Sequence, residues 1–391
     1  MLIIRTCYRS YTTPIGVTLL FVVTAMMALV ASPRAYAQNK ITVCAVGCNY
    51  TDLQQAVDAA KSGDTIRIRA GVLPLEWRGY GIILIEQKSL TIKGDGANRT
   101  VIQVGPGGGT TRRTNALYLI CSVPLDVTIE DLTLTSLGIS TGVSNEGCNV
   151  SIKNSVIAQQ SDTGIYNNGL MSLVSSSVSK NHTTGRFGNG TGGGILNGNN
   201  GQLIVRSSTI LANATGKDCG GGIANYGGTV QLLDSTVANN VSRGGCGGGI
   251  YNDSGILTAR NSHIDFNFLE YAASRATYPA LFNRGAGIYI ASGSVSLHDS
   301  SVNQNTLTDS CGAFPCLPGF GGGIYTAAGG VLTLRGTLVI GNQDFVVGNG
   351  AGLYLDSGTR LHSKDALVID NFANDQVDNC GGPGCPPVPQ S

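Results

Sequence analysis

The chain has 391 residues, with 25 lysines and arginines against 24 aspartates and glutamates, so its formal net charge is +1. Only 13% of the residues are charged and no basic stripe is visible along the sequence. This composition argues against nucleic acid and anionic membrane surfaces as partners.

The first 37 residues have the features of a signal peptide. Arg5 and Arg9 precede an apolar stretch at 15–31, and Ala35-Tyr36-Ala37 offers a small-x-small cleavage site. The alternative is an uncleaved anchor helix, for which the apolar stretch is slightly short. No second apolar span follows. We therefore expect a secreted, extracellular protein, free or at the cell surface, with no stable membrane insertion after signal cleavage.

Residues 38–71 are predicted to form an N-terminal cap. Thr51 or Asp52 can begin a helix that ends at Gly63, and a strand follows at 64–71. The apolar face of this helix consists of Leu53, Ala56, Val57 and Ala60. Such a helix would cover the first coil of a repeat structure, where a sheet edge otherwise stays unpaired.

A repeat built on Gly-Gly-Ile, a variable residue and Asn runs through the middle of the chain. It is clearest at 193–197, 221–225 and 248–252, and its aligned glycines are Gly142, Gly164, Gly194, Gly222, Gly249, Gly287, Gly323 and Gly352. Each unit contains about three short strands with alternating apolar residues. The distance between successive aligned glycines is about the length of chain that one coil of three short strands needs. It therefore predicts an all-β solenoid, a parallel β-helix of roughly ten coils over 72–375.

Two columns of asparagine and one of serine accompany the repeat. An Asn lies three residues after the inward Val or Ile of the middle strand in seven coils: Asn181, Asn213, Asn240, Asn267, Asn305, Asn342 and Asn371. One coil departs from the pattern, with Val156 followed by Gln159. A serine column and a second column from Asn145 to Asn252 run beside it. Stacked amides can bond the coils above and below, so we interpret these residues as structural.

Ten cysteines remain after Cys7 of the signal, an even number that suits an oxidising compartment. Their spacing favours five pairs: Cys44 with Cys48, Cys121 with Cys148, Cys219 with Cys246, Cys311 with Cys316, and Cys380 with Cys385. A zinc site is the weaker alternative, because no His lies beside them at ligand spacing. Residues 376–391 form a predicted Cys/Pro/Gly-rich tail.

These coils resemble the right-handed parallel β-helix, or pectin-lyase-like, superfamily. The Gly-Gly-Ile-Tyr-Asn units, such as 248–252, are similar to polymorphic outer membrane protein repeats, and the resemblance covers about 41–375. It implies the fold, and a capping helix at the start is familiar in such chains. It implies no single activity, because lyases, hydrolases, esterases, epimerases and adhesins share this fold.

A column of outward tyrosines is the first candidate site. In Gly-Ile-Tyr-Asn the isoleucine points inward, so the next residue points outward, and this position holds Tyr251, Tyr289, Tyr325 and Tyr354 in consecutive coils. Two inserts, 268–286 with Arg275 and Arg284 and 306–322, precede the column and could wall a cleft for sugar rings. The alternative is that the tyrosines stack on one another and shield the sheet.

A second candidate is an acid–base cluster. Asp234, the His263/Asp265 pair and the His298/Asp299 pair lie on consecutive coils at nearby registers. Glycoside cleavage needs two carboxylates about 5–9 Å apart, which adjacent or alternate coils could supply. Outward charged residues are more often solvated surface, and the motifs of pectate-lyase, pectin-esterase and galacturonase sites do not occur.

We therefore predict a secreted β-helix repeat protein that is a non-catalytic surface or carbohydrate-binding module, whose partner is a polysaccharide or cell-surface glycan. The alternative is a polysaccharide-acting enzyme, either a lyase or a glycoside hydrolase. No cofactor or metal is expected, and calcium would enter only in the lyase case.

Overall fold

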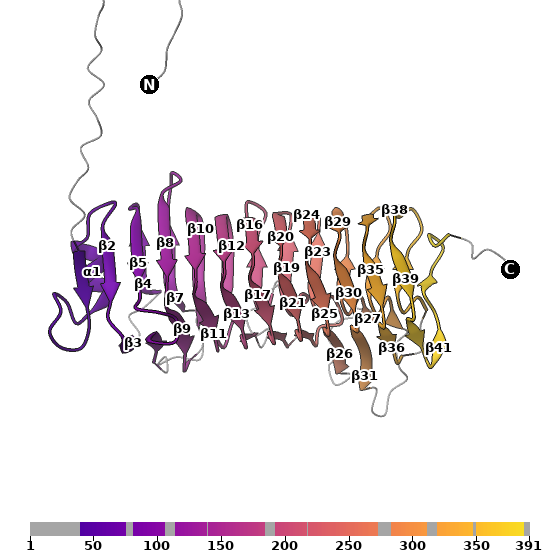
Figure 1. Ribbon diagram of the computed structural model, residues 1–391, viewed down its shortest axis with the longest axis horizontal. Helices are drawn as coiled ribbons and strands as arrows, with labels where there is room; N and C mark the ends of the chain where they lie inside the picture. The colour runs from indigo at the N-terminus through magenta and orange to yellow at the C-terminus, as the bar shows by residue number, and fades with distance from the viewer. Residues whose placement is uncertain are drawn as a thin grey trace, which may run out of the picture. The chain divides into compact units, whose positions relative to one another are not determined.

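The computed structural model describes residues 40–75, 81–105, 114–138, 140–183, 192–216, 218–272, 283–310, 319–346 and 349–386. The predicted signal peptide at 1–37 lies outside these ranges. Within them the chain folds into strands and one short helix, α1 (Leu53–Ala59). Strands at equivalent positions of successive coils pair in parallel register and follow one another side by side from β5 to β38 (Figure 1).

The coils have three faces. The first face contains β4 (Gly81–Glu86), β7 (Asn115–Ile120), the first halves of β10 (Thr141–Lys153) and β12 (Ile165–Val174), β15 (Ile195–Asn197), β19 (Ile223–Tyr226), β23 (Ile250–Asp253), β28 (Ile288–Ile290), β33 (Ile324–Thr326), β37 (Leu353–Leu355) and β42 (Cys380–Gly381). The second face contains β1 (Lys40–Val43), β2 (Thr65–Ile68), β5 (Leu90–Lys93), β8 (Asp126–Glu130), the second halves of β10 and β12, β16 (Gln202–Arg206), β20 (Thr229–Leu233), β24 (Ile256–Arg260), β29 (Ser294–His298), β34 (Val331–Arg335) and β38 (Arg360–Lys364).

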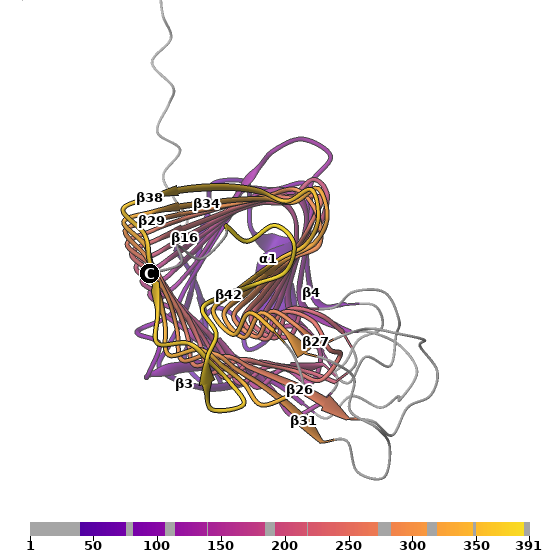
Figure 2. The same cartoon turned by 90° about the vertical axis from the view of Figure 1, so that its right-hand side faces the viewer.

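The third face contains β3 (Gly71–Leu75), β6 (Thr100–Val104), β9 (Thr133–Ser136), β11 (Val156–Ala158), β13 (Ser177–Ser179), β17 (Thr209–Leu211), β21 (Thr236–Ala238), β25 (His263–Asp265), β30 (Ser301–Asn303), β35 (Leu338–Ile340) and β39 (Leu367–Ile369). A fourth, outer sheet contains β14 (His182–Thr183), β18 (Ala214–Thr215), β22 (Val241–Ser242), β26 (Phe268–Ala272), β31 (Thr306–Ser310), β36 (Gln343–Asp344), β40 (Phe372–Ala373) and β41 (Gln376–Val377). The view along the stack superposes β16, β29, β34 and β38 on one side of the coil (Figure 2). The predicted right-handed parallel β-helix is confirmed.

Stacked aliphatic residues fill the interior. On the first face the inward position is Ile165, Ile195, Ile223, Ile250, Ile288, Ile324 and Leu353, all buried and in register from coil to coil. Burying one such side chain contributes about 1.5–3 kcal/mol relative to leaving it exposed, so this column alone is a large part of the driving force. The outward residues of the same strands are then free to vary.

Helix α1 has the expected apolar face. Asp52 caps its N-terminus through a bond from the Gln55 N–H, and Leu53, Ala56 and Val57 join the core. Lys88 donates from Nζ to the carbonyl oxygens of Val57 and Ala60 at 2.9 and 3.1 Å. A cation there satisfies carbonyls that a helix end leaves unbonded and complements the helix dipole.

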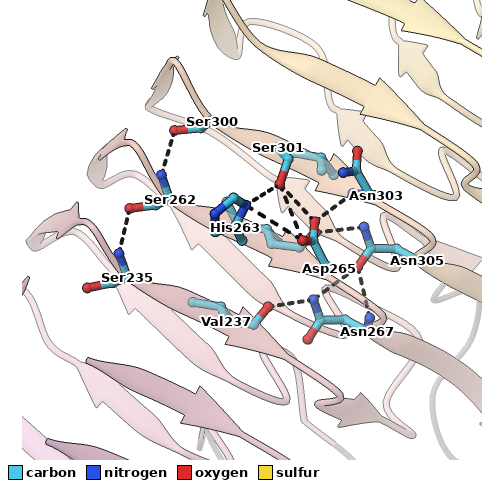
Figure 3. Close-up of polar contacts among 12 residues, drawn as sticks. Ser235, Val237, Ser262, His263, Asp265, Asn267, Ser300, Ser301, Asn303 and Asn305 are labelled. Carbon is cyan, nitrogen blue, oxygen red and sulfur yellow. Dashed lines mark hydrogen bonds and ion pairs between the residues drawn. The ribbon is translucent and has the colours of Figure 1, made fainter. Parts of the chain in front are cut away.

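The asparagine column forms a continuous hydrogen-bonded ladder (Figure 3). Asn240 is representative: its Nδ2 donates to Asn267 Oδ1 and to the Ile210 carbonyl, each at 3.0 Å. Its Oδ1 accepts from the backbone N–H and the Nδ2 of Asn213. All four bonding positions of a buried amide are thereby used, which is what an interior polar side chain requires.

The ladder begins one residue later than the sequence pattern indicated. Ile157 is the inward residue of β11 and pairs with Val178, whereas Val156 is partly exposed. Gln160 therefore occupies the ladder position, and its N–H donates to Asn181 Oδ1 at 3.0 Å. The reading of Val156 as the inward residue of this coil was wrong, and Gln159, three residues later, lies at the turn before the ladder in a left-handed conformation with φ 58°.

Four of the five predicted cysteine pairs are disulfide-bonded: Cys44–Cys48, Cys121–Cys148, Cys219–Cys246 and Cys380–Cys385. Two of them join successive coils, with Cα–Cα distances of 4.9 Å for Cys121–Cys148 and 4.8 Å for Cys219–Cys246. These distances are about the spacing of adjacent strands, so the bridges act as axial staples.

The fifth predicted pair differs from the other four, because both of its members fall in the segment 311–318. Cys311 lies outside the described residues, and Cys316 lies outside them as well. The predicted disulfide between Cys311 and Cys316 is therefore not among the bonds described above, and it stays a prediction from their spacing.

Candidate functional site

The tyrosine row lies on the outer side of the first face. Tyr251, Tyr289, Tyr325 and Tyr354 pair directly from coil to coil. Their ring centroids are 5.3, 5.1 and 5.3 Å apart in that order, and Tyr226 adds a fifth ring 5.3 Å from Tyr251. These are favourable aromatic contact distances: Tyr325 and Tyr354 are stacked, with an interplanar angle of 5°, and the other ring pairs are tilted or edge-to-face.

The two inserts cover part of this row. Strands β27 (Asn283–Arg284) and β32 (Gly319–Phe320) pair with each other, and Figure 2 shows β26 and β31 extending beyond the outline of the coils. The Arg284 guanidinium carbon lies 4.9 Å from the Tyr325 ring centroid and its Nη1 donates to the Tyr289 hydroxyl at 3.2 Å. Phe320 lies 4.6 Å from the Tyr354 ring centroid.

This cover corrects one expectation. Tyr325 is only 2% exposed, so its ring is not open to a ligand, and Arg284 holds the row together instead of pointing into a free cleft. Burial also raises the pKa of Tyr325, whose hydroxyl donates to Asp356. Tyr251, Tyr289 and Tyr354 remain half-buried. Arg275 lies outside the described residues.

An open groove occurs earlier in the same column, where the large rings are missing. Between Tyr166 and Tyr251 the outward position holds Leu196 and Ala224, which leaves a cavity of about 490 Å³. It is lined by Tyr166, Asn168, Leu196, Gly198, Asn199, Asn200 and Tyr226. We call this the tyrosine groove.

The chemistry of the tyrosine groove is amphipathic. Tyr166 and Tyr226 contribute aromatic surface and hydroxyls, and three asparagines contribute amide donors and acceptors. Burial, with the charges of Asp218 and Asp253, raises the pKa of Tyr226, so its hydroxyl keeps its proton at neutral pH. The sequence signal for this groove was the pair of smaller residues interrupting the tyrosine column, which the prediction passed over in favour of the later coils.

The predicted acid–base residues separate into different columns. His263 and Asp265 do converge, on the outer side of the third face, with Ser301 of the next coil (Figure 3). His263 Nδ1 lies 2.7 Å from Ser301 Oγ, and this hydroxyl also lies 3.1 Å from Asp265 Oδ1. The Asn303 N–H donates to the same carboxylate oxygen at 2.9 Å.

This arrangement differs from a nucleophile activated by a relay. The serine hydroxyl bonds the carboxylate directly, and one histidine nitrogen, Nδ1, faces both partners, with Asp265 Oδ2 at 3.8 Å. A catalytic relay instead places the imidazole between the two, with one nitrogen for each. Burial raises the pKa of Asp265, while the bonds from Asn303 and Ser301 oppose that shift. The cluster is a polar network that ties two coils together.

Asp234 and Asp299 have a backbone role. Both have positive φ, 50° and 48°, at the corner between the second and third faces. Equivalent corners hold Asp131, Asn154, Asn261 and Asp365, also at positive φ. Asp and Asn are the non-glycine residues that tolerate this conformation best, so the repetition of acidic residues here follows from the turn. His298 lies on the second face.

A buried carboxyl lies beneath the inserts. Asp344 follows Leu269 and Leu307 in the inward column of the fourth sheet and is fully buried beside Val346. Its Oδ1 accepts the Val346 N–H at 2.9 Å, and its Oδ2 has no hydrogen-bond partner among the residues that the structure describes. Burial raises its pKa from 3.8 to about 7, and the charge of Asp378 adds to the rise.

This pKa predicts a pH-dependent stability. Between about pH 4 and pH 7 the folded protein holds a proton on Asp344 that the unfolded chain has lost, so stability should fall as pH rises through this window. Asp344→Asn should remove this decline, which we expect to be a few kcal/mol, and raise the melting temperature at pH 8. Thermal melts at pH 4 to 8 measure it, with exposed Asp370→Asn as the control. If the melting temperature changed with pH equally in wild type and Asp344→Asn, the raised pKa of Asp344 would be contradicted.

Among the described residues, no group of three or more His, Cys, Asp or Glu side chains is placed to hold a metal ion. In the same part of the chain, no helix has the length and apolar character to cross a membrane.

No protein-family model matches the chain, and no curated protein matches it. Solved structures do match. ORF18 of Geobacillus virus E2 aligns with a TM-score of 0.50 at 12% identity, over 83% of this chain and 60% of that one. The A-module of the mannuronan C-5 epimerase AlgE4 of Azotobacter vinelandii aligns with a TM-score of 0.44 at 12% identity, over 83% of this chain and 95% of that one. Pectate lyase Pel9A aligns with a TM-score of 0.40 at 13% identity, over 85% of this chain and 79% of that one.

At these identities the likeness concerns the fold. The parallel sheets and the match to the viral structure agree on the fold that the resemblance implied, a parallel β-helix. This chain spans 60% of the length of that viral structure.

Proposed function

We propose that this protein is a secreted, non-catalytic β-helix that binds a carbohydrate chain on its first face. The tyrosine groove is the main contact, and Tyr251, Tyr289 and Tyr354 extend the surface along the stack. The observation that carries the proposal is the groove itself, in which two tyrosines and three asparagines line one cavity. Sugar rings offer apolar faces for aromatic stacking and hydroxyls for amide bonding, so this lining suits them.

Secretion is supported by the disulfides and by the N-terminal sequence. Four disulfide bonds among the described residues suit an oxidising compartment, since cytosolic thiols are kept reduced. The segment 1–37 has the order of charged, apolar and small residues that export signals share.

A polysaccharide panel separates this proposal from the enzyme alternative. The purified protein is incubated with each polysaccharide, and both binding and products are measured. The proposal expects retention of at least one polysaccharide with no new reducing ends and no ultraviolet-absorbing unsaturated product. Release of either product, abolished by loss of a particular side chain, would instead establish a hydrolase or a lyase.

Tyr226→Ala should weaken binding of a retained oligosaccharide about fivefold, the equivalent of about 1 kcal/mol for a lost stacking contact. Tyr226→Phe should change affinity little, because the ring face remains. Leu367→Ala, on the exposed third face, is the control for a large truncation away from the groove. Isothermal titration gives the affinities, and circular dichroism melts establish that each variant is folded. Equal losses in Tyr226→Ala and Leu367→Ala would refute the groove.

A further inference from the structure

The fold creates a basic column that the sequence does not reveal. The last outward residue of the second-face strands is Arg260 in β24, His298 in β29, Arg335 in β34 and Lys364 in β38. These four residues pair directly with one another from coil to coil. Because each lies a full coil from the next in the sequence, this column is not visible as a basic stripe along the chain.

The cations of the basic column are available to a partner. Arg260, Arg335 and Lys364 are exposed and His298 is half-buried. In the part of the chain that the structure describes, none of the three exposed cations lies within ion-pair distance of a carboxylate. Parallel strands are about 4.8 Å apart, so the column places three cations, with His298 between Arg260 and Arg335, within roughly 14 Å.

The local field is positive in spite of the aspartates nearby. Asp299 and Asp365 follow the column at the corner of the coil. The pKa of His298 is nevertheless lowered, first by burial and then by the charges of Arg260 and Arg335, which outweigh the opposing effect of Asp299. Burial disfavours any charge, but the positive charges of Arg260 and Arg335 at this point of the surface favour an anionic ligand.

A row of hydroxyls runs beside the basic column. Thr258, Ser296 and Thr333 lie two residues before the cations in the same strands, so they share the outer face and stack in register. A ligand that matches both rows carries an anionic group on each repeating unit together with hydroxyls. Single-stranded nucleic acid fits less well, because its sites combine positive charge with aromatic stacking platforms. No Phe, Tyr or Trp occurs in β24, β29, β34 or β38, where the outward rings are the imidazoles of His298 and His362.

We propose that the basic column and its hydroxyl row bind an acidic polysaccharide, laid along the stacking direction with its carboxylate or sulfate groups against Arg260, Arg335 and Lys364. This surface lies on the second face and the tyrosine groove lies on the first. The two proposals therefore stand or fall separately.

The test uses polygalacturonate and chondroitin sulfate as probes, dextran as an uncharged probe and a single-stranded oligonucleotide as a competing polyanion. Arg260→Gln/Arg335→Gln should weaken binding of an acidic polysaccharide about five- to tenfold at ~50 mM salt. The difference in affinity between this variant and wild type should disappear at ~1 M salt, where the Debye length is only about 3 Å. Lys61→Gln/Lys180→Gln removes the same net charge from exposed positions outside the second-face strands and should have little effect.

Several outcomes would overturn the proposal. Equal weakening in the two double variants would show attraction by net charge alone, and absence of binding to either acidic polysaccharide would remove the ligand class. Tighter binding of the oligonucleotide would assign the column to nucleic acid. Loss of acidic polysaccharide binding in Tyr226→Ala, with none in Arg260→Gln/Arg335→Gln, would place the ligand in the tyrosine groove.

Discussion

Asn240→Asp is expected to lower the free energy of unfolding by about 3–5 kcal/mol at pH 7. The carboxylate would lose the two Nδ2 donations, to Ile210 and Asn267, and would face those acceptor oxygens as a buried charge. No charged partner is available inside the described part of the ladder to compensate.

Asn239→Asp is the matched control. It makes the same chemical change one residue earlier, at an exposed left-handed position with φ 54°, where aspartate is well tolerated. Urea unfolding followed by circular dichroism compares the variants. The deficit of Asn240→Asp should shrink on acidification, because the protonated acid regains one donor. A midpoint equal to that of Asn239→Asp at pH 7 would contradict the role of the ladder.

Gly222→Ala should also destabilise the protein by several kcal/mol. An added Cβ would lie 2.7 Å from the Gly249 carbonyl oxygen of the next coil and 2.9 Å from both Asn240 Nδ2 and Val237 Cγ1. The backbone oxygen cannot move without disturbing the parallel pairing, and the other two atoms belong to the ladder and the core. The close spacing between coils therefore requires glycine at this point of the repeat.

Gly105→Ala is its control, since only the Leu75 carbonyl oxygen lies near the added carbon, at 3.4 Å. Thermal melting of the two variants and of wild type measures the difference. Similar melting temperatures for all three proteins would mean that the coils can shift apart at no cost.

The fold was predictable because its constraints repeat. Each coil needs a glycine where it approaches the next coil closely, an inward aliphatic residue and a ladder amide. The same spacing of these residues therefore recurs many times in the sequence. The coil at 156–160 was taken as a departure from the pattern because Val156 was read as its inward residue. The inward residue is Ile157, which follows that other aliphatic residue, and Gln160 then lies at the ladder position.

The candidate surfaces were harder to predict because they depend on chain segments that do not repeat. The tyrosine column was visible, but the cover that Arg284 and Phe320 place over Tyr325 comes from inserts of irregular length. The basic column was hidden because its members lie a full coil apart in the sequence and meet only when the strands pair. Asp234 and Asp299 were conspicuous as acids, yet their repetition reflects the left-handed turn and not chemistry.

The most direct test of carbohydrate binding is a crystal structure of the protein with an oligosaccharide taken from whichever polysaccharide it retains. The account predicts a sugar ring in the tyrosine groove, in contact with Tyr166 or Tyr226 and hydrogen-bonded to at least one of Asn168, Asn199 and Asn200. An oligosaccharide bound on the third face or over the His263 cluster, with the groove empty, would contradict it.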